Sequence, residues 1–359
     1  MPLAIPTADS LDAAFLERCL RDAGHGDVRV TGLSAQPIGT GQIGRCIRYT
    51  LELAGGDGRA PRSLVGKFPS EDPVSRQTGV TLRNYVKEVS FYRELQRRLF
   101  VRTPRCYYAA IEGEGPVFAL LLEDLAPAEQ GDQLAGCTAE VARSAVLELV
   151  GLHAPSFRDQ SLRGIGWLGE PSEPLVAFGR ALYKAQLEPF MARFGERLAP
   201  DEAELIRAVA GSQGPPFEPL SDAFSLVHVD YRLDNLLIDA RRAPPAVAVV
   251  DWQSVTLGSP LADVAYFLGA GLLPELRREV EGEILRDYHA ALVRAGVRDY
   301  PFERCFADYR RGAFAGFAVT VVASVMVQRT ERGDAMFTAM ARRHARHALD
   351  LGSREFLGG

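Results

Sequence analysis

Lysine is scarce in this chain: of its 41 basic residues only three are lysine, namely Lys67, Lys87 and Lys184. Because arginine is used almost everywhere else, a lysine that persists invites a chemical explanation. Cysteine is also scarce, since the 359 residues contain five, widely spaced and without a C-x-x-C pair. This spacing argues against a zinc site or a disulfide framework and fits a reducing, cytoplasmic compartment.

Long apolar runs and an excess of basic charge are absent as well. The longest apolar stretch, 313–327, is too short to span about 30 Å of hydrocarbon, so we expect a buried helix and no membrane partner. The first ten residues contain no basic residue and no apolar core, so no signal peptide is expected. The net charge of −5 argues against a nucleic-acid partner, because nucleic-acid-binding proteins usually carry a basic face.

The chain has a strand-rich beginning and a helix-rich remainder. Residues 47–53 alternate apolar and polar without a break, which predicts a half-buried strand. Further strands are expected over 63–68, 105–110 and 117–122, and helical spacing marks 84–99. After a connection at 126–136, helices are expected over 138–153, 173–194, 200–211, 274–295, 302–328 and 334–350. We therefore expect an α+β chain with two regions, 1–124 and 125–359.

A G-x-G-x-x-G motif occurs at Gly39, Gly41 and Gly44. In a dinucleotide-binding fold this loop opens a helix, whereas in a kinase-type fold it joins two antiparallel strands over nucleotide phosphates. The strand expected at 47–53 follows the loop, which favours the kinase type over an NAD-dependent dehydrogenase. The motif on its own leaves open an ordinary glycine-rich hairpin loop.

Lys67 and Glu88 form a candidate ion pair. Glu88 projects from the apolar stripe of helix 84–99, and a buried carboxylate costs on the order of several kcal/mol unless a cation meets it. Lys67, near the end of strand 63–68, is the natural cation, and a lysine held in this way could contact the phosphates of a nucleotide. The alternative is a solvated Glu88 and a surface Lys67.

The segment 226–238 places a polar H-x-D-x-x-x-x-N loop between two apolar runs. Asp230 can accept the proton of a ligand hydroxyl and align it for attack, and the amide oxygen of Asn235 can ligate Mg²⁺. Asp251 ends the next apolar run, where an acid is often a metal ligand, and an antiparallel return would bring it to Asn235. The alternatives are a polar hairpin and a carboxylate that caps a turn.

In this order the motifs resemble the aminoglycoside phosphotransferase and choline-kinase-like (APH) family. The stretch from Asp251 to Leu268 is most similar to ecdysteroid-kinase-like and uncharacterised bacterial phosphotransferase members. The resemblance implies a protein-kinase-like fold with two lobes. The small lobe, 1–124, would bind the nucleotide with an antiparallel β-sheet and one key helix. The larger, mainly helical lobe, 125–359, would contain the catalytic loop (226–253) and the acceptor site.

The resemblance also implies roles for the matching residues. The catalytic residues would be Asp230, Asn235 and Asp251, of which Asn235 and Asp251 would hold Mg²⁺. The residues that bind ATP would be Gly39, Gly41, Gly44, Lys67, Glu88 and Glu123, the last through backbone groups at the hinge. His228 and Asp263 would support the catalytic loop.

The chain departs from the family pattern at Val229, where the family often has glycine, and at Trp252-Gln253, where protein kinases have Phe-Gly. No metal or phosphate ligand is lost, and no long activation segment follows Asp251. We therefore expect a kinase that transfers the γ-phosphoryl group of ATP to a hydroxyl of a small molecule. The apolar residues of 264–273 and 312–327 recur at helical spacing, which predicts that most of them belong to the core; if part of that surface lines the cleft, it would favour a hydrophobic alcohol. The alternatives are an inactive nucleotide-binding pseudokinase and an aminoglycoside-type antibiotic phosphotransferase, although arginines intersperse the acids of helix 274–295 that a polycation would need.

Overall fold

The computed structural model describes residues 5–39, 43–56, 58–327 and 329–358. These residues group into two compact units. The first, here the sheet unit, comprises Met1–Arg97, Thr103–Ala126 and Asp251–Gln253. The second, here the helical unit, comprises Arg98–Arg102, Pro127–Val250 and Ser254–Gly359.

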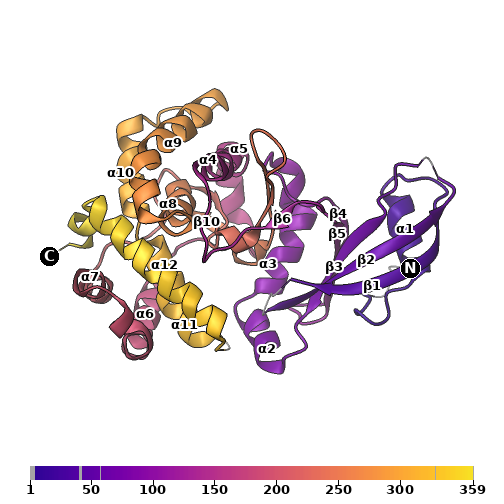
Figure 1. Cartoon of the computed structure of the whole chain (residues 1–359), viewed down its shortest axis with the longest axis horizontal. Coiled ribbons are helices and arrows are strands. Elements are labelled where there is room, and N and C mark those ends of the chain that lie inside the picture. Colours follow the sequence, from indigo (N-terminus) through magenta and orange to yellow (C-terminus); the bar gives the residue numbers. More distant parts are fainter. Residues whose placement is uncertain (1–4, 40–42, 57, 328, 359) are drawn as a thin grey trace. The chain divides into compact units, whose positions relative to one another are not determined.

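The sheet unit is built on five antiparallel strands in the order β1-β2-β3-β5-β4 (Figure 1). Its elements are α1 (Ala13–Asp22), β1 (Arg29–Ile38), β2 (Gly44–Ala54), β3 (Ser63–Pro69), α2 (Pro73–Thr81), α3 (Asn84–Ser90), β4 (Cys106–Ile111) and β5 (Phe118–Glu123). The strands expected from the alternating pattern are confirmed, whereas α2 was not expected.

Alternation along the strands decides which side chains share a face of this sheet. Leu64 and Phe68 of β3 join the apolar core that includes Leu16 of α1. Lys67 is an odd number of residues from both Leu64 and Phe68, so its side chain points to the opposite face of the sheet. On that face Tyr85 of α3 stacks on Phe118 of β5. The sequence pattern of β3 therefore delivers its single lysine to the side of the sheet that α3 covers.

The helix expected over 84–99 is not one continuous α-helix. It is α-helical as α3, widens to a π-helical turn over Phe91–Leu95 and ends in a 3₁₀ turn over Gln96–Arg98. A π turn fits one more residue into the turn, and Phe91, Tyr92 and Leu95 are all buried there.

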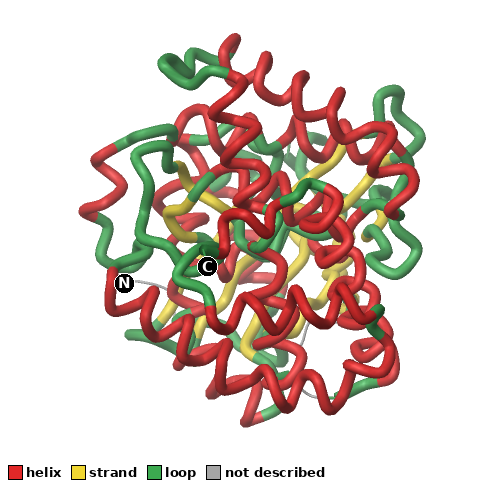
Figure 2. The backbone as a smooth tube through the Cα atoms, turned by 90° about the vertical axis from the view of Figure 1, so that its left-hand side faces the viewer, coloured by secondary structure: helices red, strands yellow, loops and turns green. Residues whose placement is uncertain are grey.

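The helical unit contains two small antiparallel sheets, with strand orders β6-β8-β9 and β10-β7. Its strands are β6 (Glu129–Gln130), β7 (Ser225–Val227), β8 (Leu236–Asp239), β9 (Ala246–Val249) and β10 (Thr256–Gly258). Its helices are α4 (Ala139–Glu148), α5 (Val150–Ser156), α6 (Glu173–Phe194), α7 (Pro200–Gly211), α8 (Pro260–Gly271), α9 (Pro274–Arg294), α10 (Phe302–Gly312), α11 (Ala315–Met326) and α12 (Glu331–Asp350). Helices predominate over strands in the chain as a whole (Figure 2), which confirms the expected α+β class.

The helix expected over 302–328 is divided into α10 and α11. Gly312 ends α10 where its backbone passes close to Leu261 of α8, and a Cβ at Gly312 would lie 2.6 Å from the Leu261 carbonyl oxygen.

None of the described helices has the length and apolar character needed to cross a membrane.

His344 of α12 lies fully buried among α8, α11 and α12. Gly269 of α8 and Gly316 of α11 make room for its ring, since a Cβ at Gly316 would overlap Nε2. Within the described part of the chain neither ring nitrogen has a hydrogen-bond partner. Burial lowers the pKa of His344 to about 3, so the ring is neutral in the folded protein.

We expect this histidine to make the fold sensitive to acid. An unfolded histidine takes up a proton near pH 6.5, and the folded one does so near pH 3. His344 therefore leaves the unfolding free energy unchanged above pH 6.5. It lowers the unfolding free energy as the pH falls from 6.5 to 3, by on the order of a few kcal/mol. His344→Leu should flatten thermal stability against pH in this window, relative to the variant's own value at pH 8. His289→Leu, at a half-buried histidine, should keep the wild-type slope; equal slopes in both variants would contradict the assignment.

Candidate active site

The loop 228–235 of the helical unit, which contains the predicted catalytic residues Asp230 and Asn235 and is called the catalytic loop below, follows β7 and places Asp230 at the centre of a hydrogen-bond network. Asn235 donates from Nδ2 to Asp230 Oδ2 at 2.9 Å and to the Asp230 carbonyl oxygen at 2.8 Å. Arg232 donates from Nε to Oδ2 at 3.1 Å, and the Tyr266 hydroxyl donates to Oδ1 at 2.9 Å. Asp230 and Asn235, the two polar ends of the D-x-x-x-x-N spacing, thus contact each other.

The electrostatic surroundings keep Asp230 ionised. Burial by itself would raise the pKa of this carboxyl, but the positive charge of Arg232 and the Tyr266 hydrogen bond outweigh it, and the pKa lies below the usual value for aspartate. Asp230 is therefore a carboxylate that can accept a hydrogen bond from a hydroxyl at neutral pH.

Asp263 holds the backbone of this loop. It is buried on α8, and its carboxylate accepts from the N–H of His228 at 2.6 Å and of Val229 at 2.9 Å. His153 contacts the same carboxylate through Nε2 at 3.4 Å, while its Nδ1 meets the Tyr288 hydroxyl. The supporting role expected for Asp263 is confirmed. His228 also contacts the carbonyl oxygen of Val250 through Nε2 at 2.9 Å, which links the loop to the end of β9.

Val229 adopts a left-handed backbone conformation, with φ of 73°. A β-branched residue is a genuine outlier there, at a cost of roughly 1–2 kcal/mol. The position therefore favours glycine on physical grounds, and the two N–H groups held by Asp263 maintain the strained turn.

Val229→Gly should therefore cost little stability. Relief of the strain offsets the greater freedom of glycine in the unfolded chain, so we expect the unfolding free energy to stay within about 1 kcal/mol of wild type. Val227→Gly, in β7 and buried with an ordinary strand conformation, should cost about 3 kcal/mol or more. Urea denaturation of both variants is the measurement, and equal losses would show that residue 229 carries no strain.

The strand register of the helical unit brings Asn235 to Val250, the residue that precedes Asp251 in the chain. In the antiparallel pair β8–β9, Leu236 lies opposite Val249. The N–H of Val250, the residue before Asp251, donates to the Asn235 carbonyl oxygen at 3.0 Å. The antiparallel return expected between the two motifs is confirmed.

In the sheet unit Lys67 is held between two carboxylates. Its Nζ lies 2.7 Å from Glu88 and 2.8 Å from Asp251 Oδ1, and the Lys67 and Glu88 side chains are only 12% and 2% exposed. Burial would lower the pKa of Lys67, but the two carboxylates outweigh it and raise the pKa, so the lysine stays charged. Burial raises the pKa of Glu88, which the neighbouring ammonium opposes. The expected ion pair is confirmed, with Asp251 as an additional partner.

The segment Asp251–Gln253 is fastened to α3 and the turn that follows it. The Trp252 ring is buried and stacks on Phe91, with centroids 3.9 Å apart and planes 6° from parallel. Asn84 donates from Nδ2 to the Gln253 carbonyl oxygen at 3.0 Å, and Gln253 donates from Nε2 to Asp251 Oδ2 at 3.1 Å. These contacts fix Asp251 beside Lys67. The contacts of Phe91 with Trp252 and of Asn84 with Gln253 were not expected. These residues are 161 and 169 positions apart, and nothing in a single sequence pairs them.

Two of the three motif glycines can be placed. Gly39 has a φ of 74°, which glycine adopts without strain. Gly44 begins β2, and a Cβ there would lie 3.1 Å from Lys67 Cε, so glycine leaves room for the lysine side chain. Gly41 lies outside the described residues. Tyr85 donates its hydroxyl to the Ile43 carbonyl oxygen at 2.8 Å, which fixes the end of the loop to α3.

Glu123 ends β5, three residues before the sheet unit's segment Thr103–Ala126 ends. Its N–H donates to the Arg105 carbonyl oxygen at 2.8 Å, and its carboxylate accepts from the Arg105 N–H at 2.9 Å. Its expected role in binding adenine stays a prediction, as does the sharing of one metal ion by Asn235 and Asp251. In the described ranges no group of three or more His, Cys, Asp or Glu side chains is arranged to hold a metal.

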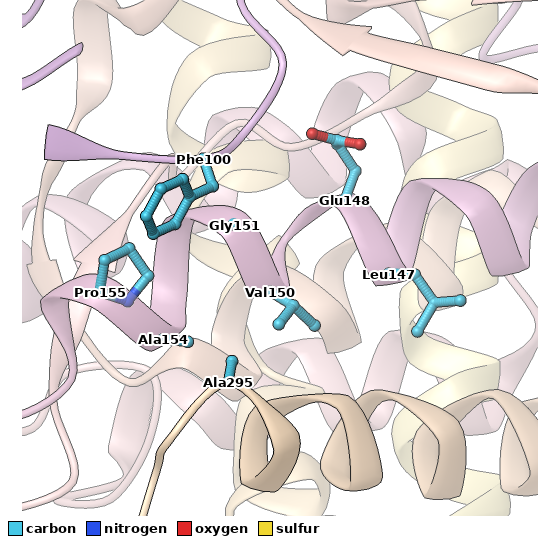
Figure 3. Close-up of a pocket in the computed structure, with 8 residues that line it drawn as sticks. All are labelled: Phe100, Leu147, Glu148, Val150, Gly151, Ala154, Pro155 and Ala295. Carbon is cyan, nitrogen blue, oxygen red and sulfur yellow. The ribbon is translucent and has the colours of Figure 1, made fainter. Parts of the chain in front are cut away.

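A cavity of about 320 Å³ lies elsewhere in the helical unit (Figure 3). Phe100 and residues of α4 and α5 surround it, and none of the expected site residues is among them; the lining is Phe100, Leu147, Glu148, Val150, Gly151, Ala154, Pro155 and Ala295.

The chain belongs to the phosphotransferase enzyme family (APH), whose sequence model matches residues 57–305. Among curated proteins, a segment of 56 residues is 48% identical to mouse (Mus musculus) acyl-CoA dehydrogenase family member 10, and it covers 16% of this chain and 5% of that protein. The chain thus matches only a small part of the length of this relative.

Solved structures show the fold. Choline kinase from Cryptosporidium parvum Iowa II is similar with a TM-score of 0.56 and 10% identity, over 89% of each chain. The GDP complex of wild-type aminoglycoside 2′-phosphotransferase-IIIa is similar with a TM-score of 0.53 and 13% identity, over 93% of this chain and 99% of that one. The expected family and the expected kinase-like fold are confirmed, and membership of the family supports a phosphotransferase.

Proposed function

We propose that this protein is an ATP- and Mg²⁺-dependent kinase that transfers the γ-phosphoryl group to a hydroxyl of a small molecule. The observation that carries the proposal is the pairing of Lys67 with both Glu88 and Asp251, together with an ionised Asp230 fixed by Asn235. Phosphoryl transfer requires mainly positioning and charge stabilisation, so a fixed ammonium for the phosphates and a fixed carboxylate for the hydroxyl are the parts that it needs.

The donor atoms on this chain fit a hard divalent cation. Asp251 offers a carboxylate, and Asn235 turns its amide nitrogen to Asp230, which leaves the amide oxygen as the atom for an ion. When bound, Mg²⁺ would neutralise charge on the phosphates. Asp230 would orient the acceptor hydroxyl and accept its proton, and Lys67 would hold the phosphates with Glu88 fixing the ammonium.

The charges of the helical unit favour an acceptor that is not a polycation. Asp234 of the catalytic loop pairs with Arg232 at 3.0 Å and with Arg332 at 3.3 Å. Four of the five acids of α9 are paired with arginine too: Glu281 with Arg277, Glu283 and Asp287 with Arg143, and Glu275 with Arg278. We therefore propose a neutral, apolar alcohol rather than an aminoglycoside.

An acceptor screen tests this function. The purified chain with Mg·ATP is assayed for ADP release with aliphatic and sterol alcohols, choline, kanamycin and an acyl thioester. The names of similar proteins suggest the last three, and the thioester is used in a hydroxylated form because the proposed reaction needs a hydroxyl. We expect acceptor-dependent release that EDTA abolishes. Thermal stabilisation by Mg·ATP without turnover on any acceptor would favour a pseudokinase, and fastest turnover on kanamycin would favour an antibiotic phosphotransferase.

A further inference from the structure

Tyr266 is a buried tyrosine whose hydroxyl contacts the proposed catalytic carboxylate. Its side chain is 1% exposed, and its hydroxyl donates to Asp230 Oδ1 at 2.9 Å. A buried hydroxyl requires a partner, and backbone carbonyl groups usually provide it. Of the other buried tyrosines of this unit, Tyr183 donates to Ile206 and Tyr231 to Ala145, whereas Tyr288 and Tyr309 contact side chains outside the loop. Tyr266 instead donates to a side chain of the catalytic loop.

Helix α8 contacts the catalytic loop through two side chains, one at its backbone and one at a side chain. Asp263 accepts the backbone N–H groups of His228 and Val229, and Tyr266, three residues later on the same helix face, holds the carboxylate of Asp230. The Tyr266 ring packs against the ring of His344, with centroids 5.0 Å apart, and belongs to the apolar core formed by α6, α7, α11 and α12. The position of the Tyr266 hydroxyl is therefore determined by the packed core and not by the loop that it contacts.

The contacts of Asp230 come from two elements of the fold. Asn235 donates to Oδ2, and Arg232 Nε lies 3.1 Å from Oδ2 and 3.0 Å from Oδ1; both residues belong to the loop. Tyr266, which donates to Oδ1, belongs to α8. Loss of the Tyr266 contact would leave both remaining donors on the loop itself, and the carboxylate could rotate with them. A misplacement of about 1 Å can cost as much as 10²-fold in rate.

We propose that Tyr266 is a positioning residue that fixes the plane of the Asp230 carboxylate. In this orientation the carboxylate can accept the proton of the acceptor hydroxyl while the hydroxyl oxygen attacks the γ-phosphorus of ATP. This inference rests on the proposed phosphotransferase function. Tyr266→Phe removes one oxygen atom and keeps the packed ring, so we expect kcat to fall about tenfold while KM for ATP and for the acceptor change less than twofold. Tyr183→Phe, which removes an equally buried hydroxyl far from the loop in sequence, should leave kcat unchanged.

A double-mutant cycle separates positioning from a structural role. In an Asp230→Ala background the tyrosine hydroxyl has no carboxylate to hold, so adding Tyr266→Phe should lower single-turnover phosphate transfer no further. An equal, additive loss in both backgrounds would overturn the proposal, as would a wild-type kcat for Tyr266→Phe. If wild type and Asp230→Ala transfer phosphate equally, the proposed function fails instead.

A crystal structure of Tyr266→Phe gives a readout that does not depend on activity. We expect the Asp230 carboxylate to be rotated while the backbone at His228 and Val229, held by Asp263, stays in place. A carboxylate in its original orientation would overturn the proposal even if no acceptor had been found.

Discussion

Asp230→Asn should lower kcat by about 10²–10⁴, the usual contribution of a positioned general base. Asparagine keeps the shape of the side chain. Its single oxygen can accept from Asn235 and Arg232, and its NH₂ group can donate to the Tyr266 hydroxyl oxygen, so the loop should remain folded. It loses the negative charge that accepts a proton from the acceptor hydroxyl. Because the residue proposed to hold the phosphates, Lys67, belongs to another segment of the chain, KM for ATP should change little.

Asp239→Asn is the matched control for this variant. Asp239 ends β8 in the same unit and pairs with Arg241, two residues later, at 2.7 Å, just as Asp230 pairs with Arg232. Removing this charge should leave kcat at the wild-type value. Steady-state kinetics on the acceptor found in the screen is the measurement, and a kcat for Asp230→Asn within threefold of wild type would show that the carboxylate is not the base.

The parts of the site that lie close in sequence, or on periodic elements, were predictable. The scarcity of lysine singled out Lys67, and the apolar stripe around Glu88 required a cation, so the pair followed from the cost of burying a carboxylate. Asp230 and Asn235 also followed, because five residues across a turn can hardly separate their side chains.

Contacts that depend on tertiary packing could not be predicted in this way. Lys67 and Asp251 are 184 positions apart, and only the resemblance to a family suggested that they serve one site. Tyr266 lies in an apolar stretch whose helical spacing predicts core, and its ring is indeed core, while its hydroxyl acts on the loop. The break of helix 84–99 into a π turn likewise depends on packing around Phe91, which local propensity does not encode.

Lys67→Met should be the most damaging substitution for both stability and catalysis. It leaves Glu88, 2% exposed, without its cation, and breaking a buried ion pair in this way costs about 3–5 kcal/mol. The same variant loses the charge that would hold the phosphates, so we expect kcat/KM for ATP to fall by about 10²–10³. Lys184→Met, at an exposed lysine of α6, should change neither quantity.

The double variant Lys67→Met, Glu88→Met separates the two effects. Replacing a whole buried pair by apolar side chains of similar volume is often neutral or stabilising, so urea denaturation should show most of the lost unfolding free energy restored. Phosphate transfer should stay as low as in Lys67→Met, because no cation returns to the site. Recovery of activity together with stability would mean that Lys67 serves only to neutralise Glu88, and the proposed contact with the phosphates would then be wrong.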